Sequence, residues 1–214
     1  MHKTLMQLTV DTERMLYQAA GVNTQVYAQD VLMQKLQHAF DHCFTSEWWP
    51  SFIRREARTL DGITGKPILP FSLIKEWKDV QSVFRKNSQH PLPTMPLSYN
   101  VLDLPSGTAA RFLEPTSDAT LFTVYPLDAT DTIVAVGRER PALEFTNNDI
   151  VPFDHMALCY FAAWDYLVDD ASNAGAASKM QGLFDSRMKE LKDAEFDNIV
   201  LLNPRSEQIP SQWY

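Results

Sequence analysis

Two histidines, His38 and His42, lie one helical turn apart, and Cys43 directly follows the second. This spacing can place two ligands on one metal ion. The zinc-peptidase pattern places a glutamate after the first histidine, but here that residue is Ala39, and no third ligand lies nearby in the sequence. We therefore interpret the pair as histidines on a helix surface or at an interface, and we expect no bound metal.

A second motif, "GITGKP", has a superficial likeness to a phosphate-binding loop. Such a loop has four residues between its glycines and a Ser or Thr after its lysine. Here two residues separate Gly62 from Gly65, and Pro67 follows Lys66. The motif is therefore predicted to be a turn between two strand-like runs.

Three carboxylates, Asp165, Asp169 and Asp170, could attract a divalent cation, because Asp165 and Asp169 share a helical face. No calcium-loop pattern surrounds them, so a solvated acidic face is the favoured interpretation. Asp169 and Asp170 stand at the end of a predicted helix, where the helix dipole disfavours negative charge. Either a cap on the following helix or a basic partner would relieve that repulsion.

The sequence contains no G-x-S-x-G elbow, no C-x-x-C pair and no glycine-rich dinucleotide fingerprint. It therefore predicts a protein that is not an enzyme and that uses no cofactor. The alternative from another functional class is a small metal-dependent hydrolase built on His38, His42 and Asp165. Metal analysis of the purified protein separates these two hypotheses.

The composition is ordinary for a globular protein, with 45% hydrophobic and 21% charged residues among 214. The net charge of −8 argues against a protein that grips nucleic acid through its phosphates, but it does not exclude a protein that nucleic acid slides past. Cys43 and Cys159 both lie in apolar helical patterns, which fits a reducing compartment. No apolar run approaches the ~20 residues of a membrane span, and the N-terminus lacks a secretory-signal pattern, so no membrane partner is expected.

Helical periodicity is predicted over about residues 9–44, in two pieces. The first helix is expected to begin at a cap on Thr9 or Asp11 and to end at Gly21. The second is expected from Thr24 to Phe44, with Pro50 as the breaker that follows it.

The remainder of the chain predicts an α+β fold. Residues 51–145 contain short β-rich runs punctuated by prolines, which indicates a small antiparallel sheet. The helical period returns over residues 150–197, where two helices joined by a short turn form an antiparallel hairpin. We expect one domain over residues 1–198, followed by an extended C-terminal arm, residues 199–214.

Three segments together resemble a known family. They are "WWPSFIRREARTLDGITGKPI" after the N-terminal helix, the β-segment "LFTVYPLDATDTIVAVGRERPALEFTNNDIVPFD" and the helical hairpin "ALCYFAAWDYLVDDASNAGAASKMQGLFDSRMKEL". With these features the chain resembles the head-to-tail connector (adaptor) proteins of tailed bacteriophages, the ring-forming family that includes the tail tubular A proteins. The resemblance covers most of residues 24–198 and is architectural, without a catalytic signature.

The resemblance implies a structural virion protein of the head–tail neck, made in the host cytoplasm. In this family rings of twelve lie beneath the portal, extend the DNA channel and provide the platform for the tail. The implied partners are the portal protein, a tail tube, nozzle or stopper protein and further copies of the chain, while DNA passes without specific binding. Another neck or tail-completion protein of the same architecture remains an alternative.

Two groups of residues are expected at interfaces. The aromatics of "EWWP" and of the β-segment exceed what one small core needs, and aromatic residues are favoured at protein interfaces. The arm either folds back on its own domain or reaches the portal or an adjacent subunit, with its apolar run adding a strand to a partner's sheet. Its candidate docking residues are Ile199, Val200, Leu201, Leu202, Ile209, Trp213 and Tyr214.

The acidic charge is concentrated towards the C-terminus. Residues 151–214 carry ten acidic and five basic side chains, a net charge of −5. Repeated around a ring, such a surface would repel DNA and let it pass without sticking. We therefore expect an acidic channel lining.

Overall fold

The structure is a computed structural model that describes residues 2–20, 28–94, 106–118, 120–142, 144–169 and 171–202. Helices and antiparallel strands both occur, which confirms the predicted α+β class. The chain divides into two compact units. We call Met1–Pro50 with Ala142–Tyr214 the helical unit, and Ser51–Pro141 the β-unit.

This division differs from the single domain expected over residues 1–198. The β-unit is inserted between the two halves of the helical unit, and a proline stands at each boundary, Pro50 and Pro141. Each unit buries its own apolar cluster, one around Phe122 and Ile133 and the other around Leu16 and Leu167. Local periodicity predicts which face of each element is apolar, but it does not predict which of these faces pack against each other. The division into two units therefore could not be predicted from it.

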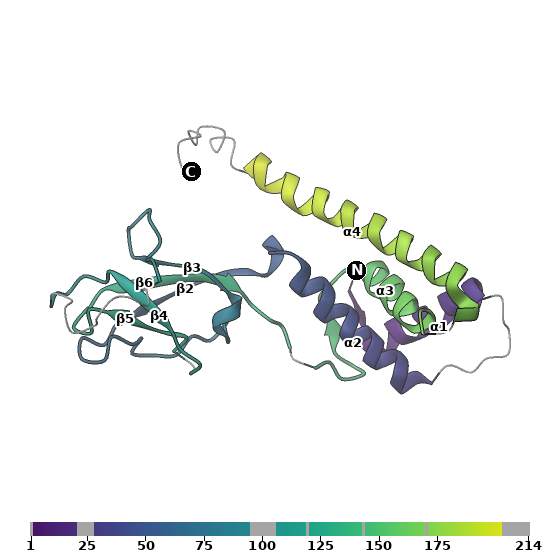
Figure 1. Cartoon of the computed structure of the whole chain (residues 1–214), viewed down its shortest axis with the longest axis horizontal. Coiled ribbons are helices and arrows are strands. Elements are labelled where there is room, and N and C mark those ends of the chain that lie inside the picture. Colours follow the sequence, from purple (N-terminus) through teal and green to yellow (C-terminus); the bar gives the residue numbers. More distant parts are fainter. Residues whose placement is uncertain are drawn as a thin grey trace. The chain divides into compact units, whose positions relative to one another are not determined.

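Among the residues that the structure describes, four α-helices build the helical unit (Figure 1). They are α1 (Leu5–Ala20), α2 (Gln29–Ser46), α3 (His155–Leu167) and α4 (Ala174–Leu202). A short 3-10 turn, η4 (Ala171–Asn173), joins α3 to α4 and completes the predicted hairpin. Two short antiparallel strands, β1 (Lys3–Thr4) and β7 (Ile150–Val151), join the start of α1 to the segment before α3.

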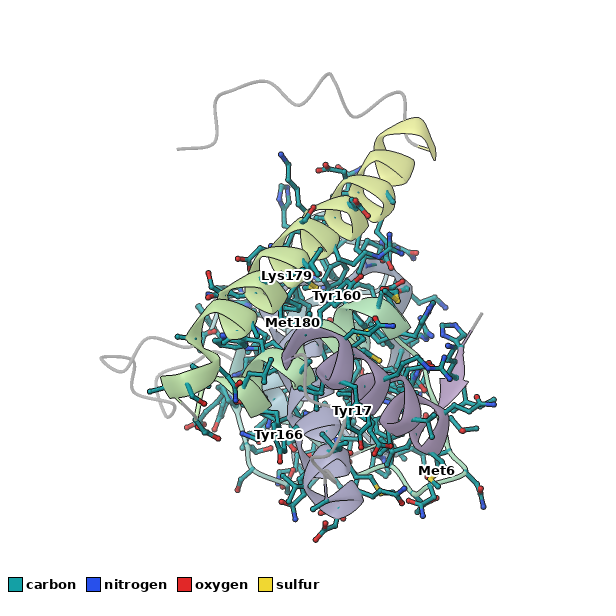
Figure 2. All side chains as sticks on the ribbon, turned by 90° about the vertical axis from the view of Figure 1, so that its right-hand side faces the viewer. Met6, Tyr17, Tyr160, Tyr166, Lys179 and Met180 are labelled. Atoms are coloured by element: carbon teal, nitrogen blue, oxygen red, sulfur yellow. The ribbon has the colours of Figure 1, made fainter. Side chains whose placement is uncertain are left out.

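Helix α3 is the centre of this unit and contacts α1, α2 and α4 (Figure 1). It is apolar on nearly all sides, as expected for a helix surrounded by others. At the outer edge of the core, Tyr17, Tyr160 and Tyr166 are half buried and pack against the apolar cluster that contains Met180 (Figure 2). A helix buried in this way positions the polar groups at its two ends.

The N-terminal helix begins earlier than predicted. Thr4 and Gln7 form a reciprocal cap, in which each side-chain oxygen accepts from the other residue's backbone N–H, at 3.3 and 3.0 Å. Thr9 and Asp11, the expected caps, therefore lie inside α1, and Thr9 Oγ1 donates to the Leu5 carbonyl instead. The predicted end at Gly21 and the start of the second helix at residues 24–27 lie outside the described residues.

The β-unit holds two antiparallel sheets (Figure 1). The first has the order β2-β6-β3, formed by β2 (Ile53–Thr59), β6 (Thr132–Arg138) and β3 (Val80–Arg85). The second pairs β4 (Phe112–Pro115) with β5 (Phe122–Tyr125). Short 3-10 turns, η1 (Pro50–Phe52) and η2 (Trp77–Asp79), precede β2 and β3. The predicted antiparallel β-region is thus confirmed.

Three buried charged side chains connect the elements of the β-unit. Glu56 on β2 is 6% exposed and accepts hydrogen bonds from the backbone N–H groups of Ser72, Leu73 and Ile74. Arg138 on β6 donates from Nε to Asp79 Oδ1 at 2.7 Å, and both side chains are buried. Such groups are stable in an interior only when paired, so each fixes the segment that supplies its partner.

Among the described residues, no helix combines the length and the apolar character that crossing a membrane requires.

Candidate functional site

The histidine and aspartate residues singled out in the sequence meet where α2 lies along the C-terminal end of α3. His38 Nδ1 lies 3.0 Å from Asp165 Oδ2, and Lys35 Nζ lies 3.3 Å from the same oxygen. Lys35 Nζ also donates to the Asp165 backbone carbonyl at 2.9 Å and lies 3.3 Å from Asp169 Oδ2. One lysine therefore contacts two of the three acidic residues, while Asp170 lies outside the described residues.

Lys35 is the basic partner that the sequence analysis gave as one of two ways to relieve the repulsion at the end of this helix. A lysine beside the last carbonyl groups of a helix stabilises the negative end of the helix dipole. It also offsets the repulsion between Asp165, Asp169 and that end of α3. Because the carboxylates already hold an ammonium group and an imidazole, the contacts describe an ion-pair cluster rather than an open cation site.

His42 serves a different purpose from His38. Its ring stacks on Phe161 with centroids 4.5 Å apart, and it lies 6.0 Å from the ring of Phe184 on α4. Burial, and secondarily the nearby His38, lowers the pKa of His42. The neutral ring therefore packs against the aromatic side chains that join α2, α3 and α4.

The hydrolase alternative needs a third ligand beside the two histidines. Within the part of the chain that the structure describes, no group of three or more His, Cys, Asp or Glu side chains is arranged to hold a metal ion. Cys43 is fully buried, and burial raises its pKa to about 12, so it is protonated at neutral pH. Of the three residues that this alternative uses, the structure brings His38 and Asp165 together, while His42 stacks on Phe161.

The "GITGKP" motif is a turn, as predicted. Residues Leu60 and Pro67 bridge across it in antiparallel fashion. The Asp61 carboxylate accepts from the Ile63 backbone N–H at 3.2 Å and from the Thr64 hydroxyl at 2.8 Å, and Lys66 pairs with Asp118 at 2.6 Å. The lysine of the motif is therefore held by a carboxylate, and the motif precedes no helix.

The expectation of interface aromatics in "EWWP" is wrong for Trp49. Its side chain is 1% exposed, its Nε1 donates to the Cys43 carbonyl at 2.7 Å, and its ring meets Phe153 edge-on. Trp48 is half buried. In the β-segment, Phe122 is likewise fully buried in the core of the β-unit. The expectation assumed that the aromatic side chains had one core to fill. Because each unit has its own core, these aromatics are no longer more than the interior needs.

The arm starts differently from the prediction. Helix α4 continues to Leu202, so an extended course for Ile199, Val200, Leu201 and Leu202 is wrong. Continuing an existing helix adds one hydrogen bond per residue and needs no new nucleus, and Pro204 is the first residue that opposes it. The side chains of these four residues, and all of Ile209, Trp213 and Tyr214, lie outside the described residues.

The contacts by which Asp154 joins α3 to α4 were not predicted from the sequence. Asp154 caps α3 by accepting from the Ala157 N–H at 3.0 Å, and both its oxygens accept from Arg187 on α4, at 3.1 and 2.8 Å. Burial alone would raise the pKa of Asp154, but the Arg187 and Ala157 hydrogen bonds lower it overall. The cap could have been predicted, because an aspartate stands directly before a helical pattern. The ion pair could not, because Arg187 lies thirty-three residues away in the sequence.

The β-unit contains an open cavity of about 460 Å³ between η2 and the β4–β5 turn. Its charged lining residues include Lys78, which pairs with Glu76 at 2.6 Å, and Asp118, which pairs with Lys66. Lys75 is the fourth charged residue, so the lining carries two basic and two acidic side chains.

The contacts of His38, His42 and Lys35 with Asp165, Phe161 and Phe184 hold α2, α3 and α4 together. In comparisons with known proteins, no family model matches the chain, and no curated protein matches it either.

Proposed function

We propose that this chain is the structural subunit of a ring in the head–tail neck of a tailed bacteriophage, lying between the portal and the tail. The observation that supports this most is the nested order of elements. Helices come first, an antiparallel β-unit is inserted, and a helical hairpin follows. The resemblance to head-to-tail connectors rests on this same order, with twelve copies as the expected number.

A ring subunit needs a fixed shape, because small errors repeated around an axis prevent closure. The helical hairpin has that rigidity. Asp154 and Arg187 join α4 to the start of α3, and Lys192 pairs with Glu47 at the end of α2. At 1.5 Å per residue, the 29 residues of α4 span about 43 Å while the 13 of α3 span about 20 Å, so α4 extends past α3 and also packs against Glu47 and Trp49.

The acidic character of residues 151–214 suits a subunit that surrounds passing DNA. A lining of negative charge repels the phosphate backbone and gives no sequence-specific contact. The partners are therefore the portal on one side, a tail tube, nozzle or stopper protein on the other, and identical copies within the ring. The C-terminal residues 203–214, with two terminal aromatics, are our candidate for the portal contact.

The test is the mass of the assembly that the purified chain forms on portal rings of its own particle, measured by native mass spectrometry. We expect twelve copies bound per portal ring. A chain that does not bind the portal, or that binds as a single copy, contradicts the proposal. Metal analysis of the same sample provides the second readout, since stoichiometric zinc would favour the hydrolase alternative.

A further inference from the structure

The three most exposed large apolar side chains among the described residues lie within seven residues of each other. Ile63 is 83% exposed, Leu69 65% and Ile68 62%. They belong to the segment between β2 and the residues held by Glu56, which we call the apolar loop, residues 61–69. Clustered exposed apolar side chains of this kind mark surfaces that bind other molecules.

The apolar loop is held in one conformation. Gly65 has a φ of +63°, and a Cβ there would lie 2.2 Å from the Val124 carbonyl oxygen, so only glycine fits. Its own carbonyl accepts from the Val124 N–H at 2.7 Å. The Asp61 turn, the Lys66–Asp118 ion pair and the Ile68 N–H bond to the Thr59 carbonyl complete the support. The exposed isoleucines are thus presented on a preorganised loop, which lowers the entropy cost of binding.

The helical unit carries a mainly apolar groove at the start of α1, which could receive apolar side chains. Its volume is about 330 Å³, and it is lined by His2, Lys3, Met6, Gln7, Val10 and Asp11. Its apolar floor is formed by Met6 and Val10, which are 39% and 42% exposed, and Lys3 pairs with Asp11 at its edge. Figure 2 shows Met6 on α1. The capped start of α1 and the β1–β7 pairing hold the backbone that carries these side chains.

The two units differ in charge. The β-unit carries eleven basic and ten acidic side chains, a net charge of +1, whereas the helical unit carries eight basic and seventeen acidic ones, a net charge of −9. Contact between the helical units of two copies is therefore opposed by repulsion. Contact between the β-unit of one copy and the helical unit of another is free of it.

We propose that the apolar loop of one copy docks into the α1 groove of a neighbouring copy. This contact uses two different surfaces, so it is head-to-tail, and repetition of a head-to-tail contact closes a ring when the rotation allows. The inference rests on the proposed function and names the subunit contact that the ring would use.

The experiment is thiol cross-linking with a short bismaleimide. One chain carries both Ile63→Cys and Val10→Cys, and Met6→Cys replaces Val10→Cys in a second version. Cys43 and Cys159 give little background, because burial raises the pKa of each to about 12. At pH 7 about 0.001% of such a thiol is thiolate, against about 3% of an exposed one.

The chain with both new cysteines is expected to give a ladder of cross-linked multimers. Ile63→Cys alone should give none, and an equal mixture of the two single-cysteine chains should stop at dimers. In the matched control, Val168→Cys, another exposed apolar position, replaces the groove cysteine and should give no ladder. Ile63→Asp should weaken self-association about tenfold or more, because its carboxylate would lose its water in an apolar groove, while Val168→Asp should not.

Three results overturn this contact: Ile63→Cys chains that join to each other, a control that cross-links equally well, or no product at the highest soluble concentration. Whether the ring forms is decided by a separate measurement, the mass of the assembly on portal rings. A ring of twelve without the ladder rejects the contact alone, whereas a ladder without any ring on portal rejects the proposed function alone.

Discussion

The Glu56 carboxylate is the residue on which the shape of the β-unit most directly depends. It accepts from three backbone N–H groups and from the Ser72 hydroxyl, and Arg58 Nη2 lies 3.0 Å away. Burial alone would raise the pKa of Glu56, but the hydrogen bonds from Ser72, Leu73 and Ile74 lower it overall. The charged form is therefore the one the fold prefers.

We predict that Glu56→Gln lowers the free energy of unfolding by about 1–3 kcal/mol at pH 7, because an amide cannot accept all of these hydrogen bonds. A lowered folded-state pKa means that the stabilisation is complete above the unfolded pKa, roughly 4.3, and declines as the pH falls through the folded value. Urea unfolding of both proteins at pH 7 and pH 3 measures the difference, which should shrink at pH 3. Glu76→Gln, an exposed pair with Lys78, is the control and should have little effect. A Glu56→Gln protein as stable as the original at pH 7 contradicts the argument.

The two histidines give the second prediction at this scale. Replacing His38 and His42 together with alanine should leave assembly on the portal intact. The cost is the loss of the His42–Phe161 stack and of the largely exposed His38–Asp165 contact, together about 1–2 kcal/mol of unfolding free energy. Infectivity and zinc content of particles carrying the double variant are the measurements. Stoichiometric zinc in the original protein, lost together with infectivity in the variant, would reject the structural interpretation.

At the scale of elements, Asp154 has two functions that substitutions can separate. It caps α3 and it pairs with Arg187 on α4. Asp154→Ala removes both and should cost about 2–3 kcal/mol of unfolding free energy, whereas Asp154→Asn keeps an acceptor for the cap and should cost about 1–2 kcal/mol. Thermal unfolding of the two variants measures the order. Equal stabilities would show that the cap contributes nothing beyond the ion pair.

The end of α4 provides a prediction about docking. Because α4 ends at Leu202, deleting residues 203–214 removes no described helix and should leave a folded, soluble subunit. Loss of interface Trp and Tyr side chains commonly costs about 2 kcal/mol or more, so portal binding should weaken more than tenfold. Circular dichroism and a portal-binding assay together test this. A truncated chain that binds normally, or that unfolds, refutes the docking role.

Sequence periodicity predicted the elements well where a run was long and uniform. The helical period over residues 150–197 predicted α3, and the strand-like run before the "GITGKP" turn predicted β2. The boundaries were less predictable, because a cap such as Thr4–Gln7 depends on which of several polar residues forms it. Trp49 looked like a surface aromatic because the sequence does not reveal that two cores must be filled.

The candidate sites were predictable only in part. The proximity of His38 to Asp165 followed from no local pattern, because 127 residues separate them and the β-unit lies between. The exposed isoleucines of the apolar loop were likewise unnoticed, because their turn motif explained the loop without indicating which side chains remain in water. Such features depend on tertiary contacts, which one sequence does not encode locally.

At the scale of the whole molecule, the account predicts which charge faces the DNA. The acidic excess of residues 151–214 should line the channel, where it would repel the phosphate backbone. A reconstruction of the neck gives the signs of the side chains around the lumen. A channel lined mainly by Lys and Arg would reject this arrangement, although it would leave the ring itself standing.

Electron cryo-microscopy of the intact particle neck tests the proposed ring most directly, because it shows the ring symmetry and the neighbours together. The account predicts a closed ring of twelve copies of this chain between the portal and the tail, with the long α4 helices repeated around the channel axis. A single copy, a closed ring of six, or a position elsewhere in the particle would contradict it.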